Sequence, residues 1–301
     1  MSRERLSSLG APSSSIPGSK TSVFQDYEKT KGFHVLQSGY MMRWSTYVPT
    51  TSVARGVVFI LHGYGDHMES CTQVNIAEHY LRRCGLACVI MDQPGHGLSC
   101  GDACAIWDWF DHVDMVREFV TDFVYPFYKK IDDANLVESK TGQRLPKFCH
   151  GLSMGGGIAV TLAIKHPGLF DSLILVAPMV YVSDHLRPSK AAETILKKVI
   201  LPLIPAWPIF PNSNLSDMCY TDADHAKKMM IREDENPVCY RGKARVCTAF
   251  SLGVQYDLFI RREMKNIDVP FLVLHGEEDI VTSPEMSKTL YEVANANPKV
   301  I

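Results

Sequence analysis

The sequence lacks three features that would place it in a special class of protein. Its 31 Lys and Arg nearly balance its 33 Asp and Glu, so no overall positive field would attract nucleic acid. No apolar run approaches the ~18 residues that a transmembrane helix needs. Its nine cysteines form no Cys-x-x-Cys pair and no finger-like spacing with histidine, which argues against a metal site and favours reduced thiols in a cytoplasmic protein.

What remains is the composition of an ordinary globular chain, with 46% hydrophobic residues. Residues 1–22 are rich in Ser, Pro and Gly and contain no apolar block long enough for a signal peptide, so we expect a flexible tail there. No internal repeat is present. We therefore expect one folded domain over residues 23–301.

From about residue 40, short apolar runs alternate with helix-length segments, a pattern typical of a mostly parallel sheet covered by helices on both faces. Strands are expected at 41–48, 57–61, 86–92, 172–178 and 271–274, and helices at 70–83, 111–129, 154–166 and 284–294. Residues from about 179 to 265 hold many prolines and no clear strand. We interpret them as a cap inserted between core segments 23–178 and 266–301, over the carboxyl edge of the sheet.

One turn points to a chemistry. Residues 147–160 predict a buried strand that turns through Gly151-Leu152-Ser153-Met154-Gly155 into a helix, which is how an α/β-hydrolase presents a serine nucleophile. Glycine is needed on both sides because side chains at positions 151 and 155 would collide with neighbouring backbone. The turn predicts Ser153 as the nucleophile of an esterase or lipase.

The same fold requires an acid and an oxyanion hole. Asp279 follows the buried strand 271–274 and is the expected acid, with Glu277 and Glu278 as weaker candidates and a solvated loop carboxylate as the alternative. The oxyanion donors are expected to be the backbone N–H groups of Tyr64 and Met154. The glycine-rich loop around Tyr64 is alternatively a plain tight turn.

Four motifs occur in order along the chain, joined by a fifth in the cap: His62-Gly63-Tyr64-Gly65-Asp66-His67, Asp92-x-Pro94-Gly95-His96-Gly97-x-Ser99, Gly151-Leu152-Ser153-Met154-Gly155-Gly156, Leu274-His275-Gly276-Glu277-Glu278-Asp279 and the cap segment 236–245. Together they resemble the monoacylglycerol lipase family in its plant- and protist-like branch. The resemblance implies a hydrolase of monoacylglycerols, lysophospholipids or hydroxycinnamoyl esters, without metal or cofactor. It also places Asp66 near the alcohol-side pocket, although helix capping is the commoner role of a loop aspartate.

The cap carries an apolar stripe within residues 195–207, with Lys197 and Lys198 opposite. Burial against the protein's own core is one interpretation. A partly exposed acyl-chain entrance that also touches lipid is the other, and the family resemblance favours it. A peripheral membrane contact through the cap is the expectation of the second interpretation, and the sequence leaves both open.

One family feature is missing, because no histidine follows Asp279. We expect a chain truncated before its last strand and helix, and so before the catalytic histidine; a shortened homologue that binds ligands without hydrolysing them is the alternative. The upstream histidines His62, His67, His96 and His150 are expected to be turn or core residues. The 301 residues alone should be poorly active, and the full-length function should be ester hydrolysis.

Overall fold

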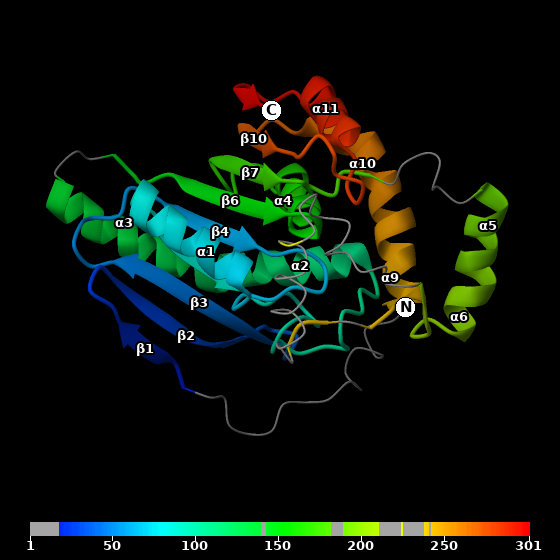
Figure 1. Cartoon of the computed structure of the whole chain (residues 1–301), viewed down its shortest axis with the longest axis horizontal. Coiled ribbons are helices and arrows are strands. Elements are labelled where there is room, and N and C mark those ends of the chain that lie inside the picture. The colour runs from blue at the N-terminus through cyan, green and yellow to red at the C-terminus, as the bar shows by residue number, and fades with distance from the viewer. Residues whose placement is uncertain (1–17, 140–142, 182–188, 211–223, 225–237, 241) are drawn as a thin grey trace.

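The computed structural model describes residues 18–139, 143–181, 189–210, 224, 238–240 and 242–301. Its centre is a nine-stranded sheet in the order β1-β2-β3-β5-β4-β6-β7-β10-β11 (Figure 1). The five pairings from β5 through β4, β6, β7 and β10 to β11 are parallel, and the three that join β1, β2, β3 and β5 are antiparallel. The strands are β1 (Lys20–Val23), β2 (Tyr27–Val35), β3 (Met41–Pro49), β4 (Val57–Leu61), β5 (Ala87–Met91), β6 (Lys147–Leu152), β7 (Ser172–Val176), β10 (Phe271–Leu274) and β11 (Lys299–Val300). The expected mostly parallel sheet is confirmed.

The antiparallel edge departs from the prediction. The sequence pattern predicts a first strand at 41–48 and a tail up to residue 22, whereas β1 begins at Lys20 and pairs with β2. β2 carries three charged residues among its first five and is half-buried along most of its length. Such a strand lacks the apolar run that marks a central strand, so periodicity alone did not reveal it. The last strand, expected to be missing, contributes two residues as β11.

The central strand β4 explains why its sequence is apolar without interruption. Val57, Phe59 and Leu61 enter the larger core cluster, and Val58 and Ile60 enter a second cluster on the opposite face. Successive side chains of a strand point to opposite faces, so a strand covered on both sides needs apolar residues throughout.

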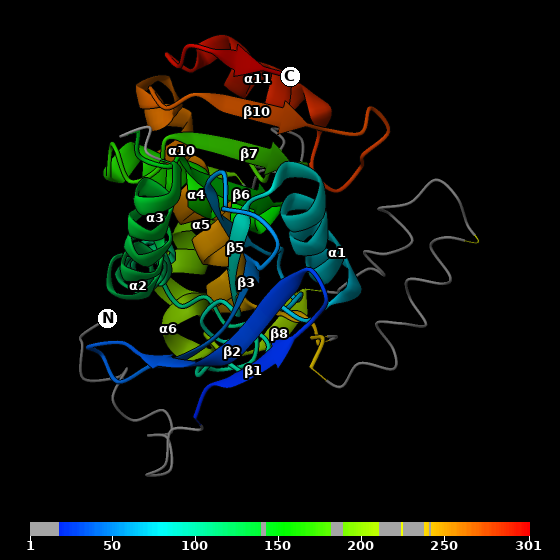
Figure 2. The same ribbon diagram turned by 90° about the vertical axis from the view of Figure 1, so that its left-hand side faces the viewer.

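Helices cover both faces of the nine-stranded sheet, as Figure 2 shows from the side. α1 (Cys71–His79) and the π-helical turn η2 (Tyr80–Cys84) lie on one face. The other face is covered by α2 (Trp109–Phe119), η3 (Val120–Val124), α3 (Tyr125–Ser139), α4 (Met154–Lys165) and α11 (Pro284–Val293). α2, η3 and α3 follow one another without a break, so the helix predicted at 111–129 is longer than expected.

The expected cap divides into two parts. α5 (Lys190–Ile195), η4 (Leu196–Ile200) and α6 (Leu201–Leu203) stand away from the sheet (Figure 1). The later part, α9 (Val246–Phe250), η5 (Ser251–Tyr256), α10 (Asp257–Glu263) and η6 (Met264–Asn266), packs Tyr256 and Ile260 into the large core cluster. A short sheet of β8 (Pro208–Phe210) and β9 (Ala244–Arg245) lies where no strand was expected.

Candidate active site

Ser153 occupies a strained turn between β6 and α4. Its backbone has φ 51° and ψ −118°, a conformation that costs a non-glycine residue about 1–3 kcal/mol. Four backbone hydrogen bonds hold it there: its N–H donates to Val176 (3.0 Å), and its carbonyl accepts from Gly156 and Met179 (2.9 Å each) and from Gly157 (3.3 Å). The strain is thus maintained by the end of β7 and the start of α4, and the side chain remains partly exposed.

The glycines around Ser153 are required by close backbone approach. A Cβ at position 155 would overlap the carbonyl oxygen of Leu61, and one at position 151 would lie 2.5 Å from the carbonyl oxygen of Gly155. These clashes confirm that positions 151 and 155 need glycine because a side chain there would collide with neighbouring backbone.

The loop after β4 passes directly beside Ser153. A Cβ added at Gly63 would lie 3.4 Å from the Ser153 Cβ and 3.9 Å from its Oγ. Residues 63–66 form a tight turn, closed by the Asp66 N–H on the Gly63 carbonyl (3.3 Å), with Gly65 at φ 79°. Met154 is the first residue of α4, so its N–H has no acceptor within the helix. The geometry is compatible with oxyanion donation by Tyr64 and Met154, which stays a prediction.

Asp279 lies in the loop after β10. Its Oδ1 accepts from the N–H groups of Val281 (2.8 Å) and Thr282 (3.0 Å), and its Oδ2 lies 2.9 Å from the Thr282 hydroxyl. The same hydroxyl lies 3.1 Å from the Ala177 carbonyl oxygen, just past β7. Because Ser153 also bonds to the end of β7, the predicted nucleophile and acid lie on either side of that strand end.

Both ring nitrogens of His275, the histidine nearest Asp279, take part in hydrogen bonds with the acid loop and α11. His275 Nε2 lies 3.3 Å from the Asp279 carboxylate and 2.6 Å from the Thr282 carbonyl oxygen, and Nδ1 lies 2.7 Å from the Ser287 hydroxyl. A carbonyl oxygen only accepts, so Nε2 carries a proton, and Nδ1 shares a hydrogen bond with the Ser287 hydroxyl. His275 therefore braces the acid loop against α11.

Asp66 is bound by its own loop and by α1. Its Oδ1 accepts from the His67 N–H (2.8 Å) and its Oδ2 from the Gln73 side chain (3.0 Å). Burial raises its pKa, and these hydrogen bonds act in the opposite direction. A glycerol contact at Asp66 stays a prediction.

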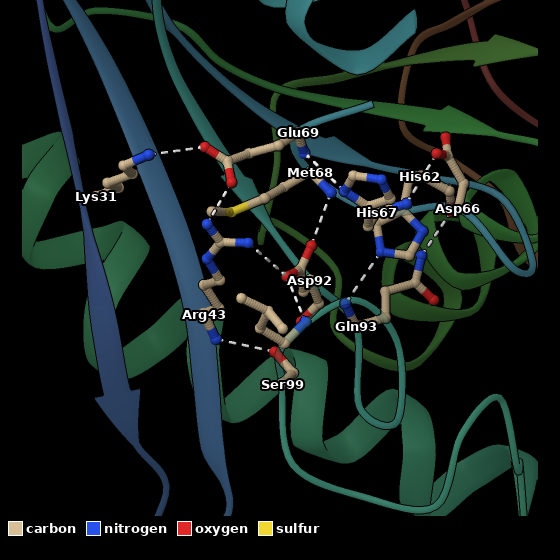
Figure 3. A network of polar contacts seen from close by, with 11 residues as sticks. Lys31, Arg43, His62, Asp66, His67, Met68, Glu69, Asp92, Gln93 and Ser99 are labelled. Carbon is tan, nitrogen blue, oxygen red and sulfur yellow. Dashed lines mark hydrogen bonds and ion pairs between the residues drawn. The ribbon is translucent and has the colours of Figure 1, made fainter. Parts of the chain in front are cut away.

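Asp92 holds the loop after β4 and the loop after β5 together, a role that its sequence motif does not reveal. The fully buried carboxylate accepts from the N–H groups of Met68 (2.7 Å) and Leu98 (2.9 Å), with the Arg43 guanidinium 3.8 Å away. Burial raises the pKa of Asp92, and the two N–H groups and Arg43 lower it. Figure 3 shows Arg43 continuing to Glu69, which Lys31 also contacts at 2.9 Å. The available signal was an acidic residue directly after a buried strand, although its partner Arg43 lies on β3, which becomes the neighbour of β5 only in the folded sheet.

Three buried histidines form a cluster that includes His62, the first residue after β4. The rings of His62 and His96 are 5.4 Å apart, and those of His96 and His112 are 6.3 Å apart. Burial lowers the pKa of His62 to about 4 and those of His96 and His112 to about 3, so all three are neutral at pH 7. None of the three has the exposed, titrating ring of a general base.

Two kinds of feature are absent from the part of the chain that the structure describes. Within the described ranges, no three His, Cys, Asp or Glu side chains gather where they could hold a metal ion. Among the described helices, none is both long enough and apolar enough to cross a membrane.

Comparison with known proteins places the chain in a family. Caffeoylshikimate esterase of Arabidopsis thaliana is 25% identical over 287 residues, covering 95% of this chain and 80% of the relative. Human monoglyceride lipase is 24% identical over 268 residues, covering 89% and 80%. The crystal structure of Paleococcus ferrophilus monoacylglycerol lipase superposes with a TM-score of 0.63 at 19% identity, covering 86% of this chain and 87% of that one.

The superposition with this solved structure confirms the α/β-hydrolase fold expected from the elbow. The Hydrolase_4 family model, described as serine aminopeptidase, S33, matches residues 52–301, which include the loop after β4, the elbow and the acid loop. The chain belongs to this serine hydrolase family.

Proposed function

We propose that this protein cleaves carboxylic esters, monoacylglycerols in particular, into fatty acid and alcohol through an acyl-enzyme on Ser153. The observation that carries the proposal is the strained turn of Ser153, which lies directly beside the loop after β4. Monoglyceride lipases among the relatives support the choice of substrate.

In the proposed reaction the Ser153 hydroxyl attacks the ester carbonyl. The N–H groups of Tyr64 and Met154 would stabilise the negative oxygen of the tetrahedral intermediate. Asp279 would orient the histidine that takes the proton of Ser153. Because the sequence has no histidine after Asp279, we expect the 301 residues alone to react at a residual rate, about 10³–10⁴-fold above water.

Labelling with a fluorophosphonate tests the nucleophile. We expect slow, saturable labelling of Ser153 in the 301-residue chain and none in Ser153→Ala, with Ser172→Ala as a matched control that labels normally. Mass spectrometry identifies the modified residue. Labelling at another serine, or equal labelling of Ser153→Ala, would contradict the assignment.

A series of esters tests the substrate. A monoacylglycerol lipase should prefer long acyl chains, because each buried methylene adds about 0.8 kcal/mol of transfer free energy. The similarity to caffeoylshikimate esterase favours a hydroxycinnamoyl esterase as the second candidate, and lysophospholipids are a third class of substrate. Binding of a fatty acid without Ser153 labelling would instead support a non-catalytic lipid-binding protein.

The stripe on α5, η4 and α6 supports the proposed contact with a membrane surface. Ile195 (53%), Val199 (50%), Leu203 (74%) and Trp207 (56%) are exposed, and Lys197 and Lys198 are exposed on the same segment. Apolar side chains flanked by lysines suit an interfacial helix on an anionic bilayer.

Sedimentation with vesicles tests that contact. Val199→Ser with Leu203→Ser should lower the bound fraction on phosphatidylserine-containing vesicles, with an unchanged circular dichroism spectrum. Val23→Ser with Leu258→Ser removes equally exposed apolar residues elsewhere and serves as the control. Equal binding of the two double variants would contradict a membrane contact through the stripe.

The thiols support a cytoplasmic location. All eight cysteines among the described residues are free thiols, four of them buried. Reduced cysteines are typical of cytosolic proteins.

A further inference from the structure

The loop beside Ser153 is supported by a histidine that the proposed reaction does not use. His62 is fully buried at the end of β4, and its Nδ1 lies 2.8 Å from the carbonyl oxygen of Gly63. That oxygen belongs to the same peptide group as the N–H of Tyr64. In a trans peptide the C=O and N–H bonds point in opposite directions, so a bond that fixes the carbonyl also fixes the direction of the N–H.

The neighbouring contacts determine which nitrogen of His62 carries the proton. The backbone N–H of Gln93 donates to His62 Nε2 at 3.1 Å. A backbone N–H only donates, so Nε2 is the acceptor and Nδ1 carries the hydrogen. Burial lowers the pKa of His62 to about 4, which keeps the ring neutral at pH 7. Nδ1–H is therefore the donor to the Gly63 carbonyl.

A second group fixes the same segment. The side-chain amide of Gln93 donates to the His62 carbonyl, and its oxygen accepts from His112 Nε2 at 3.3 Å. Figure 3 shows Gln93 beside the His62 ring, between the loop after β4 and the loop after β5. Gln93 thus holds His62 at two places, since its side chain binds the His62 carbonyl and its backbone N–H binds the ring. Within the ring, the bond accepted at Nε2 and the bond donated from Nδ1 polarise one another.

We propose that His62 is a positioning residue of the oxyanion hole, whose Nδ1–H holds and polarises the Gly63–Tyr64 peptide so that the Tyr64 N–H faces the substrate oxygen. The proposal rests on the proposed function, because an oxyanion forms only if Ser153 attacks an acyl or phosphoryl group. It assigns to a buried histidine a role in transition-state binding without any contact with substrate.

Two substitutions separate positioning from simple packing. In His62→Asn the side-chain amide nitrogen can take the place of Nδ1 and keep the donor to the Gly63 carbonyl. In His62→Gln the amide nitrogen reaches the place of Nε2 and loses that donor. Both remove the ring, so a merely structural role would affect them alike. His150→Gln is the control for loss of a buried histidine, since His150 bonds to Tyr80 on the α1 face.

The readouts are the fluorophosphonate labelling rate of Ser153 and the amide proton shift of Tyr64. We expect labelling about tenfold slower in His62→Gln, less than the 10²–10³-fold loss of an entire donor, with rates near wild type in His62→Asn and His150→Gln. The Tyr64 amide proton should move upfield in His62→Gln alone.

Other outcomes separate the two proposals. Equal rates and equal Tyr64 shifts in His62→Gln and His62→Asn would overturn the positioning role. If both variants unfold, ¹⁵N spectra of the histidine rings in the unaltered protein decide, because a proton on Nε2 of His62 would also overturn it. If Ser153 is unlabelled even in the unaltered protein, the proposed function fails, while the Tyr64 shifts still test the positioning of the peptide.

Discussion

The two halves of the candidate site are built differently. On the oxyanion side, His62, Asp92 and Gln93 are fully buried and connect the loops after β4 and β5. On the acid side, Asp279 is held by its own loop, whose residue Ile280 is 69% exposed. A group that must bind a developing charge benefits from donors fixed in a dry interior, whereas an acid that orients a base needs only local support.

Acidification should affect the oxyanion side most. The pKa values of His62, His96 and His112 lie near 4, 3 and 3 in the folded protein, against 6.5 for an exposed histidine. The unfolded chain therefore takes up protons first, and stability present above pH 6.5 is lost as the pH falls toward 4. At pH 5 the three histidines together should lower the free energy of unfolding by about 6 kcal/mol relative to its value above pH 6.5. The raised pKa values of Asp66 and Asp92 act in the opposite direction.

Urea unfolding across this pH range isolates a single histidine. His112→Gln keeps a donor toward Gln93 but cannot titrate, so its free energy of unfolding should fall less steeply than that of the unaltered protein, by about 1.4 kcal/mol per pH unit between pH 6 and 4. Parallel pH profiles would mean that His112 is protonated in the folded protein.

Removal of Asp92 should have the next largest effect. Asp92→Ala leaves the N–H groups of Met68 and Leu98 and the Arg43 guanidinium without their carboxylate, at a cost of about 3–5 kcal/mol in urea unfolding. Asp92→Asn keeps one acceptor oxygen and should lose less. A change below 1 kcal/mol for Asp92→Ala would show that the oxyanion side does not depend on this connection.

The acid side should respond least. Thr282→Val removes the hydroxyl that lies near both Asp279 and the Ala177 carbonyl, and we expect a loss of about 1 kcal/mol. Hydrogen exchange of the Val281 amide should accelerate, while that of Met68 should not. A loss as large as that of Asp92→Ala would erase the contrast between the two sides.

Much of the fold followed from local patterns. Strand 57–61 matches β4 residue for residue, and the helices after the elbow and after the acid loop differ from prediction by one residue at their ends. Uninterrupted apolar strands and glycine-marked turns carry strong local signals. The charged β2, and the return of α9–α10 to the core, depended on partners far away in the sequence.

The sequence by itself determined the α/β-hydrolase fold, the elbow at Ser153 and the candidate acid at Asp279, because steric limits on the backbone and the carboxyl ends of parallel strands specify those positions. Only the tertiary structure decided what supports them. The bond of His62 to the Gly63 carbonyl, the carboxylate of Asp92 between two loops and the exposure of the stripe on α5 and α6 depend on which segments meet in space. Residue spacing does not encode such contacts, since hydrogen bonds and burial form between segments that folding alone brings together.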